Sequence, residues 1–304
     1  MAFDSDVLID RRRLKRRLAT WRLLALISLL AVVAVAFLRV PSLPGSQHIA
    51  VLWVEDIIFT DPYRDAAIEA LVDDPSVAAV MVHIDSPGGT TFGSEALYRG
   101  LLKVGEVKPV VAVMNQLAAS GGYMTALAAD YIVARESTIT GSIGVVLEAT
   151  NFVGLMEKLG IENDTITSGP LKAQPNPLSR LSPEARAATR QVVDDIHVMF
   201  VSMVVERRGM SESEAQRLAD GRIYTGAMAK ENGLIDAIGG EEVAIAWLEV
   251  ARDVEPELPL LDVQIDYPEE LLDKLLSESI GKSQLLERLR LDGLVSLWQP
   301  RGIE

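Results

Sequence analysis

From residue 48 onward, apolar β-rich segments alternate with amphipathic helical segments, and this alternation constrains the fold more than any other feature. We expect strands at residues 48–59, 77–85, 110–115, 131–134, 143–147 and 162–167. We expect helices at residues 62–72, 93–104, 121–129, 152–159, 183–208, 211–219, 227–232 and 241–251. Repeated β-α-β units predict an α/β fold with a mainly parallel sheet and right-handed crossovers. The near-continuous apolar strands indicate a sheet covered on both faces.

Two helix starts in the second half of the chain carry specific capping signals. Ser182 followed by Pro183 predicts the start of a long helix that Gly209 ends. Ser211, with Glu214 three residues later, forms a capping-box pattern for the next helix.

A basic tail at residues 1–20 precedes a segment, residues 21–40, that we interpret as a transmembrane signal anchor. Its uninterrupted apolar run, Leu23–Leu38, covers roughly 24 Å as a helix, slightly less than a hydrocarbon core of about 30 Å. Arg22 and Arg39 can snorkel to the two interfaces. The positive-inside rule predicts a single-pass protein of the inner membrane, with a cytoplasmic N-terminus and its body on the extracytoplasmic side.

A cleaved signal peptide is the alternative interpretation of this segment. Ala34-Val35-Ala36 resembles a small-x-small cleavage site, but the apolar run continues past it. After the anchor we expect a linker at residues 41–47, one domain at residues 48–251, and a C-terminal extension at residues 252–304. The extension contains one strand-like stretch and a helical segment at residues 269–290, and it is a possible oligomer contact.

Composition excludes several classes of function. The net charge is −14, divided into +5 for residues 1–39 and −19 for the rest, so the body lacks the basic face that nucleic-acid binding requires. The absence of cysteine excludes disulfides, thiolate metal sites and a cysteine nucleophile. No HExxH or similar metal-ligand spacing occurs, and we expect neither a metal nor a cofactor.

Two expected strands end in glycine-rich turns, at the sheet edge where α/β proteins bind ligands. Asp85–Gly89 (DSPGG) can turn tightly and leave backbone N–H groups directed at an oxyanion. Ala118–Gly122 (AASGG) places Ser120 at a strand-to-helix junction, where the amide of the following residue can donate to an oxyanion. Taken singly, the first motif is also compatible with a plain turn and Ser120 with a plain helix cap.

A serine nucleophile needs a base, and the three histidines are poorly placed for this role. His48 follows the linker, His83 lies within an expected buried strand, and His197 lies in the middle of a helix. A lysine can act instead where burial lowers its pKa. Lys172 stands in an otherwise uncharged loop, although a lone lysine in a loop is usually solvated.

Several motifs together carry a resemblance to a known family. In chain order they are His83–Gly89 (HIDSPGG), Ala119–Tyr123 (ASGGY), Thr140–Val145 (TGSIGV), Ser168-Gly169 with Lys172, Asp220–Gly226 (DGRIYTG) and Gly233–Asp236 (GLID). In order and spacing they resemble the signal peptide peptidase A family over about residues 48–250. The single copy of the motif set is similar to the short form of that family. The resemblance implies a fold related to the proteolytic subunit of Clp protease and to crotonases.

The resemblance also implies roles for individual residues. It makes Ser120 the nucleophile and Lys172 its general base, with Gly88 and Gly121 as oxyanion donors and Ser142 orienting the lysine. In the short form this Ser–Lys dyad is completed within one chain or across neighbouring protomers, and the sequence leaves both arrangements open.

The implied function is that of a membrane-anchored serine endopeptidase that degrades remnant signal peptides and other unfolded apolar peptides. The resemblance implies a homo-oligomer without a cofactor, in contact with membrane lipid through the anchor. The apolar faces of residues 192–205 and 271–289 could supply contacts between copies. The alternatives are a crotonase-like acyl-CoA enzyme, which needs neither Ser120 nor Lys172, and a non-catalytic membrane scaffold.

Overall fold

The computed structural model describes residues 21–22, 25, 28, 47–267 and 295–297. The chain divides into two compact units, residues 1–46 and residues 47–304, and everything below concerns the second unit. Among the described residues, no helix has the length and apolar character needed to cross a membrane. The expected anchor at residues 21–40 and the expected helix at residues 269–290 lie mostly or wholly outside this part of the chain.

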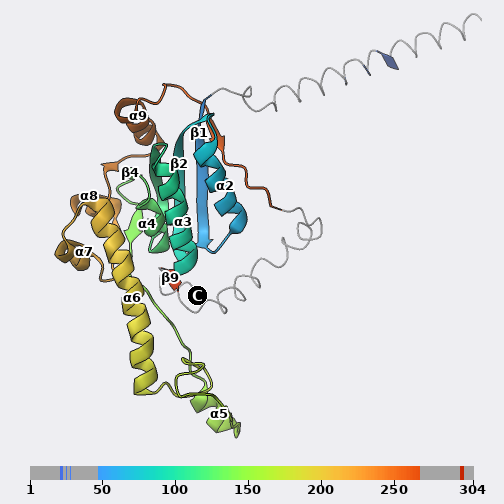
Figure 1. The fold of residues 1–304 in the computed structure, drawn as a ribbon, viewed down its shortest axis with the longest axis vertical. Helices are drawn as coiled ribbons and strands as arrows, with labels where there is room; N and C mark the ends of the chain where they lie inside the picture. Colours follow the sequence, from blue (N-terminus) through green and yellow to red (C-terminus); the bar gives the residue numbers. More distant parts are fainter. Residues whose placement is uncertain (1–20, 23–24, 26–27, 29–46, 268–294, 298–304) are drawn as a thin grey trace, which may run out of the picture. The chain divides into compact units, whose positions relative to one another are not determined.

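A mixed, mainly parallel sheet of nine strands forms the centre of the second unit (Figure 1). The strands are β1 (His48–Ile58), β2 (Val77–Thr90), β3 (Val110–Ala119), β4 (Tyr131–Ala134), β5 (Ile139–Gly141), β6 (Ile223–Thr225), β7 (Ala237–Ile238), β8 (Leu260–Asp262) and β9 (Val295–Leu297). The main path runs β6-β5-β3-β2-β1-β8, with β4 pairing with β3 and β7, and β9 pairing with β2. The described pairs are parallel except β5–β6 and β2–β9. The predicted α/β class with a mainly parallel sheet is therefore confirmed.

The helices connect these strands, and most of them begin and end close to the predicted positions. They are α2 (Pro62–Asp73), α3 (Thr91–Gly105), α4 (Gly121–Ala126), α5 (Val153–Leu159), α6 (Pro183–Arg208), α7 (Glu212–Leu218), α8 (Gly226–Glu231) and α9 (Glu241–Arg252). Ser182 caps α6 through the amide of Ala185, and Gly209 ends that helix in the left-handed conformation. Ser211 and Glu214 form the predicted capping box of α7.

Both faces of the sheet are covered, as the apolar strands predicted. Alternate residues of β2 enter two separate hydrophobic clusters, with Val82 in the first and Met81 in the second. Leu97 of α3 and Met124 of α4 belong to the first cluster, whereas Leu248 of α9 belongs to the second. The central strands therefore cannot shift register without moving apolar residues to the wrong face.

Two predicted strands are wrong. Residues 143–147 do not form a strand; the strand in this region is β5, a few residues earlier, and Ser142 follows it with a positive φ of 50° that turns the chain away from the sheet. Residues 162–167 contain no strand and are exposed. Their alternating pattern has no sheet edge beside it, and a strand depends on a partner for its hydrogen bonds.

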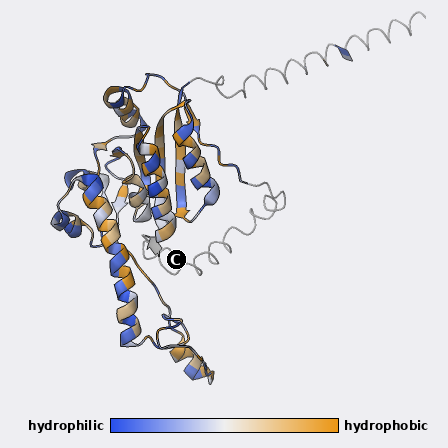
Figure 2. Cartoon of the chain, viewed as in Figure 1, coloured by the Kyte–Doolittle hydropathy of each residue, from blue (hydrophilic) through white to orange (hydrophobic). Residues whose placement is uncertain are grey.

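We call residues 147–182 the arm. They lead from the sheet to α5 and on to the start of α6, and α6 then runs back to the sheet (Figure 1). Helix α5 has no buried residue, and Figure 2 shows that several residues at this end of the chain are hydrophobic. Exposed apolar side chains of the arm are Phe152, Leu155, Leu159, Ile161, Ile166, Leu171 and Leu178. Clustered apolar exposure of this kind marks an interaction surface.

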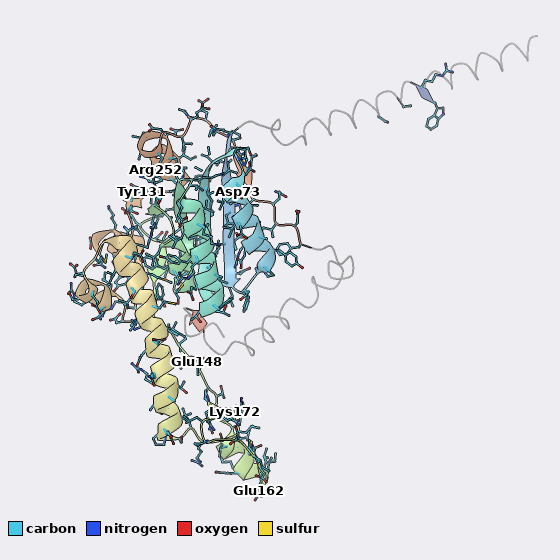
Figure 3. All side chains as sticks on the ribbon, viewed as in Figure 1. Asp73, Tyr131, Glu148, Glu162, Lys172 and Arg252 are labelled. Atoms are coloured by element: carbon cyan, nitrogen blue, oxygen red, sulfur yellow. The ribbon has the colours of Figure 1, made fainter. Side chains whose placement is uncertain are left out.

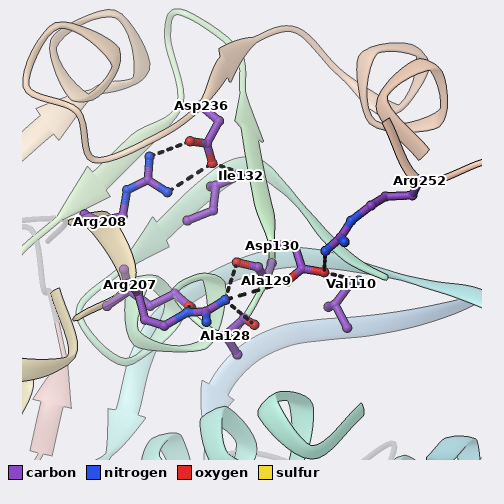
Figure 4. Close-up of polar contacts among 10 residues, drawn as sticks. Val110, Ala128, Ala129, Asp130, Ile132, Arg207, Arg208, Asp236 and Arg252 are labelled. Atoms are coloured by element: carbon purple, nitrogen blue, oxygen red, sulfur yellow. Dashed lines mark hydrogen bonds and ion pairs between the residues drawn. The ribbon is translucent and has the colours of Figure 1, made fainter. Parts of the chain in front are cut away.

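Two arginines in the last turn of α6 fix the base of this helix to the sheet unit (Figure 4). Arg207 donates to the carbonyls of Leu127 at 2.8 Å and Ala129 at 3.0 Å, which follow α4. Arg208 forms a two-pronged ion pair with Asp236, at 2.7 and 3.0 Å. These contacts hold the α6 end that lies beside α4, while the other end carries the arm.

We predict that Arg208→Ala lowers the free energy of unfolding by about 3 kcal/mol, because it leaves the partly buried carboxylate of Asp236 without its counter-charge. Urea denaturation followed by circular dichroism measures this change. Arg190→Ala in the same helix is the matched control, since its ion pair with Asp194 is solvent-exposed and should be worth less than about 0.5 kcal/mol. Equal effects of the two substitutions would contradict this account of how α6 is fixed.

Candidate active site

The carboxyl ends of β2, β3 and β5 lie side by side, and two glycine-rich segments meet there. Ser86 of β2 pairs with Ala118 of β3. Ala119 of β3 pairs in turn with Gly141 of β5. The two segments therefore share one edge of the sheet, as expected. The predicted turn at Asp85–Gly89 is wrong, however, because these residues belong to β2, which continues to Thr90.

Ser120 occupies the sharp turn between β3 and α4 in a conformation that few L-residues adopt. Its φ is 55° and its ψ is −116°, and the residue is 1% exposed. Its N–H donates to the carbonyl of Gly141 at 2.8 Å, and its carbonyl accepts from the amide of Met124 at 2.9 Å. Although Ser120 stands at the N-cap position of α4, its side chain makes no capping hydrogen bond. A backbone strain of about 1–3 kcal/mol at such a turn is typical of a functional serine.

The residues after Ser120 must be glycines because the neighbouring segments approach so closely. A Cβ on Gly121 would lie 3.1 Å from the amide nitrogen of Gly89 and would collide with Ser94 Oγ. A Cβ on Gly122 would lie 2.8 Å from the carbonyl oxygen of Ser86. Glycine therefore allows the start of α4 to pack directly on the last residues of β2.

Gly88 and Gly89, near the carboxyl end of β2, are not equivalent. The N–H of Gly88, whose φ is 102°, donates to Ser86 Oγ at 3.1 Å. Ser86 Oγ in turn donates to the carbonyl of Asp56 at 2.5 Å. The amide of Gly88 is thus engaged by a neighbouring side chain of the same strand, while the amide of Gly89 lies beside Gly121.

Ser142 lies at the same edge of the sheet. It follows Gly141, is 8% exposed, and its N–H donates to the carbonyl of Arg222 at 2.8 Å. Since Gly141 also accepts from the amide of Ser120, one short segment links the backbones of the two predicted site residues. The structure therefore brings together Ser120, Gly88, Gly121 and Ser142.

Lys172 lies elsewhere, in the arm beside α5 (Figure 3). Its side chain is exposed, and its backbone N–H closes a turn with the carbonyl of Gly169 at 3.1 Å. Within one chain, the described geometry does not bring this lysine to the edge where Ser120 lies.

The buried polar side chains in the described part of the chain are hydroxyls, apart from Arg64 and His83. His83 stacks on Trp53 with ring centroids 4.3 Å apart, and its Nε2 lies 3.2 Å from a carboxylate oxygen of Glu241. Its ring is therefore already engaged by an aromatic neighbour and a carboxylate.

Strand β9 lies against the last residues of β2, which include the two glycines. It pairs antiparallel with β2, with Leu297 opposite Gly88, Ser296 opposite Gly89 and Val295 opposite Thr90. An extended segment can therefore add to β2 beside the residues that approach Gly121.

Sequence reasoning missed two polar residues here, Ser86 and Ser94. Ser86 was treated only as a member of the turn, although its hydroxyl bonds the Gly88 amide. Ser94 lies on the buried side of α3 and is 0% exposed. The helical spacing of Ser94, Leu97 and Leu101 carried this signal, because it places a serine on an apolar face.

Comparison with known proteins finds a matching family. Residues 103–255 match the family model described as Peptidase family S49. This segment contains Ser120, Ser142 and Lys172.

Individual relatives agree with this match. A protein of Synechocystis sp. named as a candidate protease is 38% identical over 224 residues, which cover 73% of this chain and 79% of that protein. A protein of Enterococcus faecium named as a candidate signal peptide peptidase SppA is 33% identical, over 77% of this chain and 68% of its own length. The chloroplastic serine protease SPPA of Arabidopsis thaliana is 33% identical over 84% of this chain and 36% of its own length.

Among solved structures, a point mutant of the 1510-N membrane-bound stomatin-specific protease aligns with a TM-score of 0.48 at 13% identity. The alignment covers 74% of this chain and 100% of that one.

Proposed function

This chain belongs to peptidase family S49 and is a serine peptidase similar to signal peptide peptidase A. We propose that it hydrolyses apolar peptides with Ser120 as the nucleophile and Lys172 as the general base. The observation that carries the assignment of Ser120 is its strained, buried position at the meeting point of β2, β3 and α4. The fold that best fits this arrangement is the one shared by the Clp proteolytic subunit and the crotonases.

In the proposed reaction, Ser120 Oγ attacks the peptide carbonyl carbon while the uncharged amine of Lys172 accepts the hydroxyl proton. The protonated lysine then gives this proton to the leaving amine, and water hydrolyses the acyl-enzyme with the lysine again as base. Gly121 and either Gly88 or Gly89 donate backbone N–H groups to the oxyanion, and Ser142 orients the lysine. Removal of one such donor costs roughly 10²- to 10³-fold in kcat in other serine peptidases.

The lysine that serves each Ser120 comes from a neighbouring copy of the chain. This arrangement is supported by the position of Lys172 on an exposed arm beside α5, whereas Ser120 is buried at the edge of the sheet. It is further supported by the apolar side chains that the arm and α5 leave exposed, which a second copy would cover. Association of several copies would also remove water from the dyad, which an uncharged lysine requires.

The proposed substrates are remnant signal peptides and other unfolded apolar peptides at the membrane. An extended peptide can add antiparallel to Gly88–Thr90, the strip that β9 covers in the structure. Anchoring through residues 21–40, with the peptidase domain on the extracytoplasmic side of the inner membrane, would hold the site close to such peptides.

We predict that Ser120→Ala and Lys172→Ala each abolish hydrolysis of a fluorogenic apolar peptide, whereas the two variants coexpressed in one oligomer recover activity. In random mixed rings roughly a quarter of sites would pair an intact Ser120 with an intact Lys172 from the adjacent copy. Gel filtration and circular dichroism should show both variants folded and assembled. Lys172→Arg should stay inactive alone, because arginine does not lose its proton.

An inactive mixture of folded, assembled variants would contradict a dyad shared between copies. Turnover by the purified Ser120→Ala variant would contradict the assignment of the nucleophile itself.

We predict that Ser296→Pro lowers the KM for peptide substrates by roughly fivefold, because proline weakens the pairing of β9 and uncovers the strip that a substrate uses. Ser296→Ala, which keeps the backbone N–H, is the matched control and should leave KM unchanged. An unchanged KM in the proline variant would show that β9 does not compete with substrate.

The proposed anchor is tested by extracting cell membranes with alkaline carbonate. We predict that the full chain stays in the membrane pellet at its full mass, whereas a chain of residues 47–304 is released. A full chain that is released, or one shortened by processing near Ala36, would contradict an uncleaved anchor.

A further inference from the structure

The side chain of Ser94 is buried at the point where α3, α4 and the carboxyl end of β2, with Gly88 and Gly89, meet. It lies in the first turn of α3, four residues after the capping residue Thr90, and is 0% exposed. Its hydroxyl oxygen is buried without a hydrogen-bond partner in the structure. An unsatisfied buried hydroxyl costs about 1–3 kcal/mol, so its presence here calls for a reason other than stability.

Ser94 occupies the space that a side chain on Gly121 would need. A Cβ added to Gly121 would collide with Ser94 Oγ and would lie 3.0 Å from Ser94 Cβ. The amide nitrogen of Gly89 is 3.1 Å from the same point. The three residues therefore meet at one contact, with Ser94 wedged against the residue that follows the nucleophile.

We infer that Ser94 is a positioning residue for the oxyanion hole, acting through Gly121. This inference rests on the proposed function, because it concerns the amide that would receive the substrate oxyanion. Ser94 fills the space beside Gly121 and thereby sets the distance between the amide of Gly121 and the amides of Gly88 and Gly89. Oxyanion donors act only when they are held at hydrogen-bonding distance, and a displacement of about 1 Å can cost 10²-fold in rate.

The role predicts opposite effects on stability and on turnover. Ser94→Ala removes an unsatisfied hydroxyl, so the melting temperature should stay the same or rise. The same substitution loosens the contact with Gly121, so kcat should fall about tenfold while KM stays within about twofold. A purely structural serine would instead lose stability and leave the kcat of the folded protein unchanged.

A steric rescue provides the second test. Gly121→Ala should lower kcat by about 100-fold, because its Cβ collides with Ser94 Oγ and displaces the amide. Adding Ser94→Gly removes this collision, and the double variant should recover at least about tenfold of kcat relative to Gly121→Ala. Gly100→Ala, on the same helix, is the matched control, since its Cβ would make an ordinary contact of 3.4 Å with Ile68 and should leave kcat unchanged.

The experiment measures kcat, KM and melting temperature for the full chain and these variants in detergent, with a fluorogenic apolar peptide and with Ser120→Ala as the blank. Reduced kcat in a stable Ser94→Ala, together with rescue in the double variant, supports the role. Wild-type kcat in Ser94→Ala, or a folded double variant as impaired as Gly121→Ala, overturns it while the peptidase assignment stands. A wild type without Ser120-dependent turnover overturns the proposed function, and the role of Ser94 with it.

Discussion

The close approach of the first residues of α4 to the carboxyl end of β2 is the constraint on which the rest of the site depends. Glycine at 121 and 122 lets two backbones meet without side chains between them, and Ser120 takes up the resulting bend at a φ of 55°. The strain is held by the hydrogen bond from Ser120 to Gly141 and by the cores on both faces of the sheet. The sheet thus stabilises a local conformation that the serine would not adopt alone.

In the proposed site, the edge of the sheet supplies the nucleophile and the oxyanion donors but not the base. The edge of the sheet contributes a buried hydroxyl and backbone amides, whereas Lys172 is carried by an exposed arm. The ion pair between Arg208 and Asp236 fixes the root of α6, so the arm extends from a rigid base. A site divided in this way would be completed only on assembly, which would limit proteolysis by unassembled chains.

The sheet, its helices and their caps could be predicted from the sequence because the signals are local. Alternation, apolar runs and the capping pairs at Ser182 and Ser211 all operate within a few residues. The predicted strand at residues 162–167 failed for the opposite reason, since strand formation depends on an edge that the arm does not offer. Residues 143–147 failed because the turn at Ser142 ends β5 early, and a positive φ at a serine has no compositional signal.

The same distinction applies to the site. The meeting of Ser120 with the glycines could be predicted because their motifs lie at strand ends that the fold brings together. The sequence could not show that the Gly88 amide bonds to Ser86 or that Ser94 fills the space beside Gly121, because both depend on the detailed backbone path and on contacts between elements. Nor could it show that Lys172 lies away from Ser120 within one chain, since Lys172 lies in a segment whose position is not set by the sheet.

The most direct test of this account is an experimental structure of the assembled protein, with the distance measured between Lys172 Nζ of each copy and Ser120 Oγ of every copy. The account predicts one such pair per site within about 3.2 Å, formed between neighbouring copies and shielded from water. An assembly in which each Lys172 side chain points into solvent, out of reach of every Ser120, would contradict it.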